Sequence, residues 1–147
     1  MPLRKQPTIT LDAFARGRVD ELLARLQGQL VNVISASHPD AIHDLRVSIR
    51  RLTQALRALR GVFAKKSVRP VRRDLKDMMD LAAEIRNRDI ALQLMSDAGI
   101  APDSPLAKSF AIERSANQRR LVNLARRWYR KKLIDDWKAL LAGEAAA

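Results

Sequence analysis

The sequence predicts an all-α protein, an antiparallel four-helix bundle with long helices and a basic groove, and three observations support this. Ala, Leu, Arg and Lys dominate the 147 residues while Gly occurs five times, a composition typical of helical proteins. Apolar residues recur at helical spacing in four long stretches. Short links with proline or glycine separate these stretches. The length suits one domain, so we expect a flexible lead-in over residues 1–9, a single helical domain over 10–142 and a frayed tail over 143–147.

The first predicted helix covers residues 11–34, with Thr10 as its N-cap because a threonine hydroxyl accepts a hydrogen bond from the first turn. Its apolar face consists of Phe14, Val19, Leu22, Leu23, Leu26, Leu30, Val33 and Ile34. The segment SASHPD then ends it. Pro39 disfavours helix in the residue before it and suits a first helical turn, so the second helix is expected to begin near Pro39 or Asp40.

The second helix is predicted to end near Phe63, and the link AKKS leads to a third helix over residues 67–98 with Gly99 at its C-cap. Pro70 is expected in its first turn, where the missing N–H does no harm. The segment GIAPDSP is the clearest break in the chain. A fourth helix is predicted over residues 105–141, with the core residues Leu106, Ala107, Phe110, Leu121, Leu124, Ala125, Trp128 and Leu133.

The net charge of +12, from 28 Lys and Arg against 16 Asp and Glu, exceeds what solubility requires. It indicates a polyanionic partner, for which nucleic acid, an anionic membrane and polyphosphate all qualify. The chain has no cysteine, which excludes disulfides and thiolate zinc sites and fits a reducing compartment. The start MPLRKQPTIT lacks the apolar region of a signal peptide, and no run of about 18 apolar residues could span a bilayer. We therefore expect a cytoplasmic protein without a membrane span.

One stretch, HDLRVSIRRLTQALRALR over residues 43–60, combines five arginines and a histidine with an apolar helical face. At 100° per residue one stripe contains His43, Arg46, Arg50, Thr53, Arg57 and Arg60. Arginine forks at such spacing suit successive phosphate groups, which they bind bidentately. The third helix adds a stripe of Arg69, Arg73 and Lys76 with Arg72 beside it, and the fourth adds Arg119, Arg126 and Arg130. In a bundle these stripes are expected to converge on one groove.

HDLRVSIRRL at residues 43–52 and RNRDIAL at residues 86–92 resemble the CHAD family, the conserved histidine α-helical domain. Thr53 stands where the family often has an arginine, and Ala91 and Leu92 replace the Asp and Val of its second signature, with Ile85 in place of a usual glycine. The resemblance implies non-catalytic binding of inorganic polyphosphate by residues at the matching positions, His43, Arg46, Arg50, Arg51 and Arg88. The charge pattern adds Arg57, Arg73, Lys76 and Arg126.

Members of that family usually contain two four-helix bundles in tandem, whereas this chain covers one. Two alternatives follow: the chain acts alone as a short single-bundle member, or two copies form a homodimer that rebuilds the longer basic channel. For the location we expect the cytoplasm, with association with polyphosphate-containing granules as one option beside binding of free polymer or of a phosphorylated partner.

The same residues bear on other functions. General nucleic-acid binding uses the same electrostatics and is the alternative, although no recognition-helix, zinc-finger or aromatic-sheet motif is present. No glycine-rich phosphate loop and no nucleophile paired with a base occurs, so we expect no enzyme, no catalytic residue and no cofactor. Pro39 separates His38 from His43, which argues against a metal site. Arg60, Lys65 and Lys66 are interpreted as a solvated helix end, and Asp89 as a structural partner of an arginine.

Overall fold

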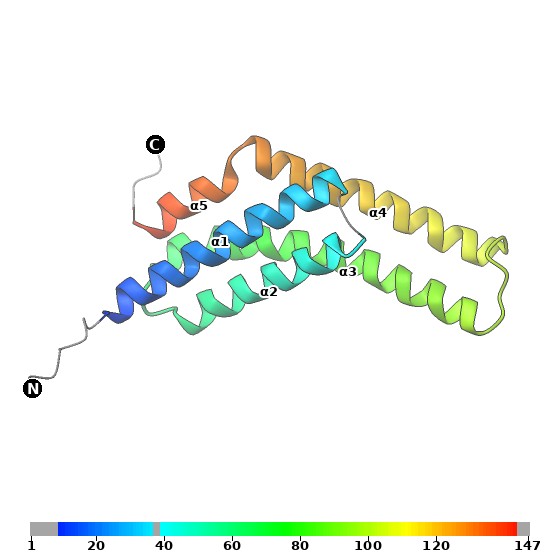
Figure 1. Ribbon diagram of the computed structural model, residues 1–147, viewed down its shortest axis with the longest axis horizontal. Coiled ribbons are helices and arrows are strands. Elements are labelled where there is room, and N and C mark those ends of the chain that lie inside the picture. The colour runs from blue at the N-terminus through cyan, green and yellow to red at the C-terminus, as the bar shows by residue number, and fades with distance from the viewer. Residues whose placement is uncertain (1–8, 37–38, 144–147) are drawn as a thin grey trace, which may run out of the picture.

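The computed structural model describes residues 9–36 and 39–143, and within these ranges it has five helices and no strand (Figure 1). They are α1 (Leu11–Ser35), α2 (Ala41–Ala58), α3 (Lys65–Asp97), α4 (Pro105–Arg130) and α5 (Leu133–Leu141). The predicted all-α class is confirmed. Most of the lead-in, nearly all of the tail, and His38 lie outside the described residues. In the part of the chain that the structure describes, every helix is too short or too polar to cross a membrane.

Several predicted helix ends are confirmed, and capping explains them. The Thr10 hydroxyl accepts a 3.1 Å hydrogen bond from the Ala13 backbone N–H, as expected of the N-cap of α1. Ser104 does the same for α4, where Pro105 occupies the first turn. The end of α3 differs from the prediction by one residue: the helix ends at Asp97 with Ala98 as its C-cap, and Gly99 follows with φ of 77°, a left-handed conformation that glycine adopts without steric cost.

The link between α2 and α3 differs from the prediction. The second helix ends at Ala58 instead of Phe63, and α3 begins at Lys65, which places Pro70 in its second turn. Between these helices the chain turns back at Gly61, and the Phe63 side chain is buried with 5% of its surface exposed. Burial of this aromatic ring favours the turn, because a continued α2 helix would extend past the core.

The predicted fourth helix was wrong as one element, because it is two helices, α4 and α5. Lys132 separates them with φ of 52° in the left-handed region. Trp128 and Trp137 are nine residues apart and would lie on opposite sides of a continuous helix. The break allows both rings to be buried, and they meet edge to face with centroids 5.2 Å apart.

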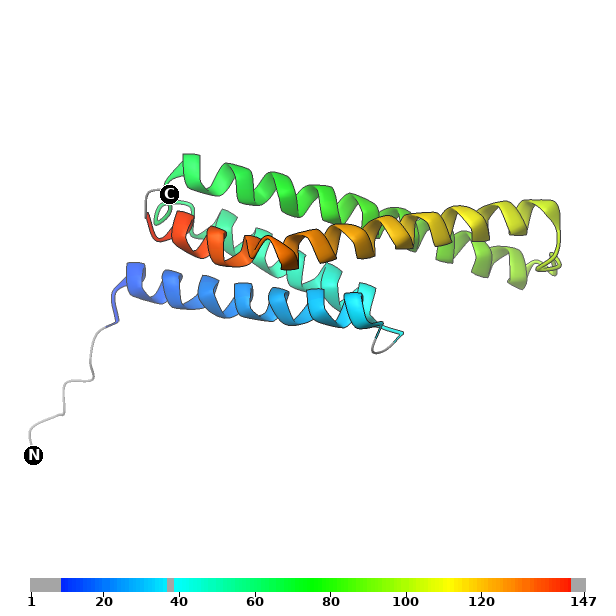
Figure 2. The ribbon, with the colours of Figure 1, turned by 90° about the horizontal axis from the view of Figure 1, so that it is seen from above.

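Successive helices from α1 to α4 run in alternate directions (Figure 1). The α1 helix packs on α2 and α4, and α3 packs on α4 and α2, around fully buried leucines such as Leu23, Leu45 and Leu75. The hairpin of α3 and α4 extends well past α1 and α2 (Figure 2). Two predicted core residues are exposed: Leu106 lies on this extension, and Phe14 lies beside the buried face of α1.

Candidate functional site

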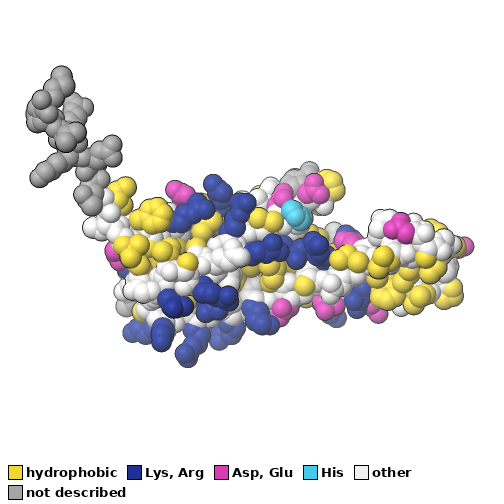
Figure 3. Space-filling model, turned by 90° about the horizontal axis from the view of Figure 1, so that it is seen from below, with side chains coloured by type: hydrophobic (Ala, Val, Ile, Leu, Met, Phe, Trp, Pro, Cys, Tyr) yellow, Lys and Arg dark blue, Asp and Glu magenta, His cyan; other side chains and the backbone are white. Residues whose placement is uncertain are grey.

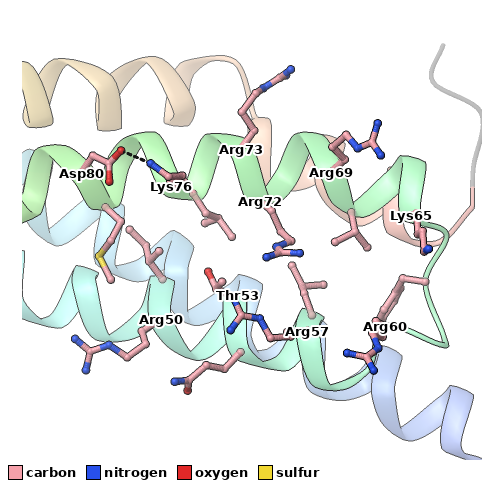
Figure 4. Close-up of a pocket in the computed structure, with 17 residues that line it drawn as sticks. Arg50, Thr53, Arg57, Arg60, Lys65, Arg69, Arg72, Arg73, Lys76 and Asp80 are labelled. Atoms are coloured by element: carbon pink, nitrogen blue, oxygen red, sulfur yellow. Dashed lines mark hydrogen bonds and ion pairs between the residues drawn. The ribbon is translucent and has the colours of Figure 1, made fainter.

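A groove of about 1060 Å³ lies between α2 and the first half of α3 (Figure 4). We call it the α2–α3 groove. Eight cationic side chains line it: Arg50, Arg57, Arg60, Lys65, Arg69, Arg72, Arg73 and Lys76. Its apolar lining comes from Ile49, Leu56, Phe63, Val68, Leu75 and Met79. Asp80 is the one acidic residue among the lining residues.

Helical spacing places these cations on two facing walls. On α2, Arg50, Arg57 and Thr53 between them are three or four residues apart, so they share one side of the helix. On α3, Arg69, Arg72 and Lys76 follow the same spacing. Arg72 reaches toward α2 and Arg57 lies opposite it, whereas Arg73 points away from α2 (Figure 4). Like charges on both walls repel each other, and an anion between them would relieve that repulsion.

A second group of arginines adjoins the groove at Arg46. The Nε atom of Arg46 is buried and has no hydrogen-bond partner. Burial lowers the pKa of the Arg46 guanidinium, and the nearby positive charges of Arg86 and Arg50 lower it further. Arg86 and Arg50 therefore both lie close enough to Arg46 for their positive charges to act on it. Basic side chains gather on this side of the molecule (Figure 3), and a buried unpaired donor here suits an anionic ligand.

The sequence-predicted site residues separate into two sets. Arg50, Arg57, Arg73 and Lys76 line the groove, and Arg46 adjoins it. Four others do not line it, namely His43, Arg51, Arg88 and Arg126. His43 is exposed in the first turn of α2, where its Nδ1 is 3.4 Å from the Asp44 carboxylate. Arg51 is exposed on α2 and Arg126 is exposed on α4.

Arg88 is engaged within the protein. Its Nε donates a 2.6 Å hydrogen bond to Glu113 of α4, and its guanidinium also lies 3.5 Å from Glu84 and stacks over the Phe110 ring. The neighbouring Asp89 accepts a hydrogen bond from Arg114, also on α4. The expectation that Asp89 is a structural partner of an arginine is confirmed, with Arg114 as that arginine. Both pairs join α3 to α4.

Four groove cations were missed as site residues: Arg60, Lys65, Arg69 and Arg72. Arg60 and Lys65 were interpreted as a solvated helix end, but the turn that buries Phe63 folds them onto the mouth of the groove. Arg69 and Arg72 had a visible signal, because they are spaced three and four residues along α3 before Lys76. Their side of the helix could be assigned only once the position of α2 was known.

Among the described residues, no group of three His, Cys, Asp or Glu side chains is placed to hold a metal ion. Compared with known protein families, residues 17–147 match the model of the CHAD domain. No curated protein and no solved structure matches the chain.

Proposed function

Because the chain belongs to the CHAD domain family, which is related to polyphosphate binding in general, we propose that it binds inorganic polyphosphate in the α2–α3 groove without catalysis. The observation that carries the proposal is the imbalance of charge in that groove. Eight cations and a single carboxylate line it. In this proposal α1 to α4 form one four-helix unit, and α2 and α3 are the walls that meet the ligand.

The chemistry of the lining supports a linear chain of phosphates. Arginine presents a planar fork that binds two phosphate oxygens at once, and it stays charged at every physiological pH. Six of the eight groove cations are arginines. Binding would release counterions from the polymer, so the logarithm of the affinity should fall with the logarithm of salt concentration by about 0.7 for each contact, as for single-stranded polyanions.

The Arg46 cluster supports an extension of the same path. Arg50 lines the groove and also lies near Arg46, and Arg46 lies near Arg86 across from it on α3. A polymer that follows the groove toward the start of α2 would therefore meet the half-buried Arg46 guanidinium, whose Nε has no hydrogen-bond partner. We expect this inner end to hold the most tightly bound phosphate, because the field of a charge is strongest where water is excluded.

The groove does not offer a stacking surface for nucleic-acid bases. Phe63 is its one aromatic lining residue, and its ring is almost fully buried. Single-stranded nucleic acids bind largely through such stacking. Polyphosphate has no bases to stack, so it fits the lining better. In the cell we expect a cytoplasmic protein that meets its ligand free or in granules.

The test compares two charge-matched double variants by titration with polyphosphate. We expect Arg57→Gln with Arg72→Gln, on the two walls of the groove, to weaken binding on the order of a hundredfold. Arg119→Gln with Arg130→Gln removes the same charge from exposed positions on α4 and should change the affinity by less than about threefold. Equal losses in both variants would show a general charge effect and contradict the groove as the site.

Competition completes the test. Duplex DNA or RNA at matched phosphate concentration should fail to displace polyphosphate across a salt series. Displacement at equal concentration would instead identify a general nucleic-acid-binding protein. Polyphosphate should also keep its chain length after incubation with the protein, because release of phosphate would reveal an enzyme.

A further inference from the structure

The far end of the α3–α4 hairpin is apolar and uncovered. The α3 and α4 helices have 33 and 26 residues. The α2 helix has only 18 and does not reach the far end of the hairpin (Figures 1 and 2). Beyond that cover, Ile90 is 46% exposed and Leu94 is 63% exposed. Ile100 and Leu106 are exposed at the same end. Figure 3 shows apolar side chains gathered over it. Monomeric proteins rarely expose a patch of this kind, so it indicates an interaction surface.

The exposed positions on α3 continue the side of the helix that faces α2. Met79 lines the groove opposite α2, and Arg86 lies near Arg46 of α2. Ile90 follows Arg86 by four residues and Leu94 follows Ile90 by four, so both lie on the same helical side. Within the described ranges α2 begins at Ala41, and no other helix packs on the side of α3 that carries Ile90 and Leu94. We call Ile90 and Leu94 the open α3 face.

The charge of this end differs from that of the rest of the chain. Residues 89–113 contain four carboxylates and one lysine, a net charge of −3, in a chain whose net charge is +12; two of these carboxylates, Asp89 and Glu113, pair with Arg114 and Arg88 just outside the range. The remaining residues therefore carry +15. Two copies that approach through their α2–α3 sides bring strongly positive regions together, which opposes association. At the hairpin ends a second copy meets less of this repulsion.

The occupant also needs an apolar surface of its own, because burial of Ile90 and Leu94 against the cationic groove of another copy would desolvate charges. The same face on a second copy is apolar and is related to the first by a twofold axis, which is the commonest symmetry of soluble oligomers. We propose that two copies of this chain associate through their hairpin ends, each covering the open α3 face of the other. Both α2–α3 grooves stay open in such a dimer.

This inference does not rest on the proposed function and is tested separately, by light scattering of the full chain after nuclease treatment. At tens of micromolar the wild-type protein should have the mass of two 16.6 kDa chains. Ile90→Glu with Leu94→Glu should raise the dissociation constant at least tenfold and give a monomer of unchanged helicity, since it buries unpaired carboxylates.

The matched control is Ile112→Glu. Ile112 is 68% exposed on the same hairpin, but it is nine residues from the buried Leu121 and so lies on the opposite side of α4. This variant should remain a dimer. A wild-type monomer at this concentration would overturn the proposal, as would a dimer that survives the double substitution or is lost with Ile112→Glu.

Salt distinguishes the twofold dimer from a charged contact. The mass should stay constant as salt is raised, because an apolar interface does not depend on unscreened charge. Dissociation in high salt, or growth beyond two copies with concentration, would instead indicate the acidic hairpin end docking on the basic surface of the next copy and would also overturn the proposal.

Discussion

Lys76 donates a 2.8 Å hydrogen bond from its Nζ to a carboxylate oxygen of Asp80, one turn later on α3. The bond, together with the charge of Asp80, raises the pKa of Lys76. Both side chains are largely exposed, at 74% and 62%, so the pair is of the kind that contributes little to stability. Asp80 thus neutralises one of the groove cations without holding it firmly, and under the proposed function a phosphate group would compete with it for Lys76.

Removal of this carboxylate should therefore strengthen polyphosphate binding. We expect Asp80→Asn to raise the affinity severalfold at low salt and to steepen the salt dependence by about 0.7, the contribution of one further contact. Asp20→Asn makes the same change of charge at an exposed position on α1 and should have a much smaller effect. An equal gain in both variants would mean that net charge, and not the groove, governs binding.

The groove shows how far the sequence alone predicts a site. Arg50 and Arg57 were predicted because helical spacing fixes which side of α2 they occupy, whatever the fold. Arg60 and Lys65 were not, because their place depends on the turn around Phe63, which is a matter of tertiary packing. Arg88 was predicted from its motif, but its guanidinium pairs with the carboxylates of Glu113 and Glu84. Glu113 is 25 residues away in the sequence, so this pairing could not be read from the motif.

Those contacts predict a structural role for Arg88. With 26% of its side chain exposed, it pairs with Glu113 and stacks on Phe110. We expect Arg88→Ala to lower the free energy of unfolding by about 1 to 2 kcal/mol, measured with urea, and to leave polyphosphate affinity within about twofold. A double-mutant cycle with Glu113→Gln should give a coupling of about 0.5 to 1 kcal/mol. Weaker polyphosphate binding with unchanged stability would instead make Arg88 a ligand of the polymer.

Asp74 predicts a dependence of stability on pH. Burial raises the pKa of its carboxyl group above the ordinary value of 3.8, the charge of Arg73 opposes this rise, and the charge of Asp77 adds to it. The folded state therefore binds the proton more tightly than the unfolded chain does. This group contributes its full stabilisation at pH values below 3.8, and the contribution is lost as pH rises through the raised pKa. At neutral pH the ionised carboxylate therefore lowers the stability of the fold.

Asp74→Asn should remove that cost. At pH 7 we expect the variant to be more stable than the wild type, and near pH 3 the two should unfold at the same denaturant concentration. Asp20→Asn controls for the added net charge and should be neutral or slightly destabilising at pH 7. A stability difference for Asp74→Asn that persists at pH 3 would assign its effect to packing.

The break between α4 and α5 was only partly predictable from the spacing of apolar residues. Leu121, Ala125 and Trp128 follow one helical face, and that face was predicted correctly. Trp137 falls out of phase with them by half a turn, so a single helix would have exposed one of the two tryptophans. The phase change was readable in the sequence, but the position of the break was not, because neither glycine nor proline marks it.

Lys132 carries the strain of that break. A left-handed conformation costs an L-residue roughly 1 to 2 kcal/mol, whereas glycine adopts it freely at the expense of a more flexible unfolded chain. We expect Lys132→Gly to raise the free energy of unfolding by about 0.5 to 1 kcal/mol, or the melting temperature by a few degrees. Lys131, with φ of −79°, is an ordinary helix end, so Lys131→Gly should leave stability unchanged or lower it by about 0.5 kcal/mol. Equal effects of the two substitutions would show that the turn between α4 and α5 is not strained at Lys132.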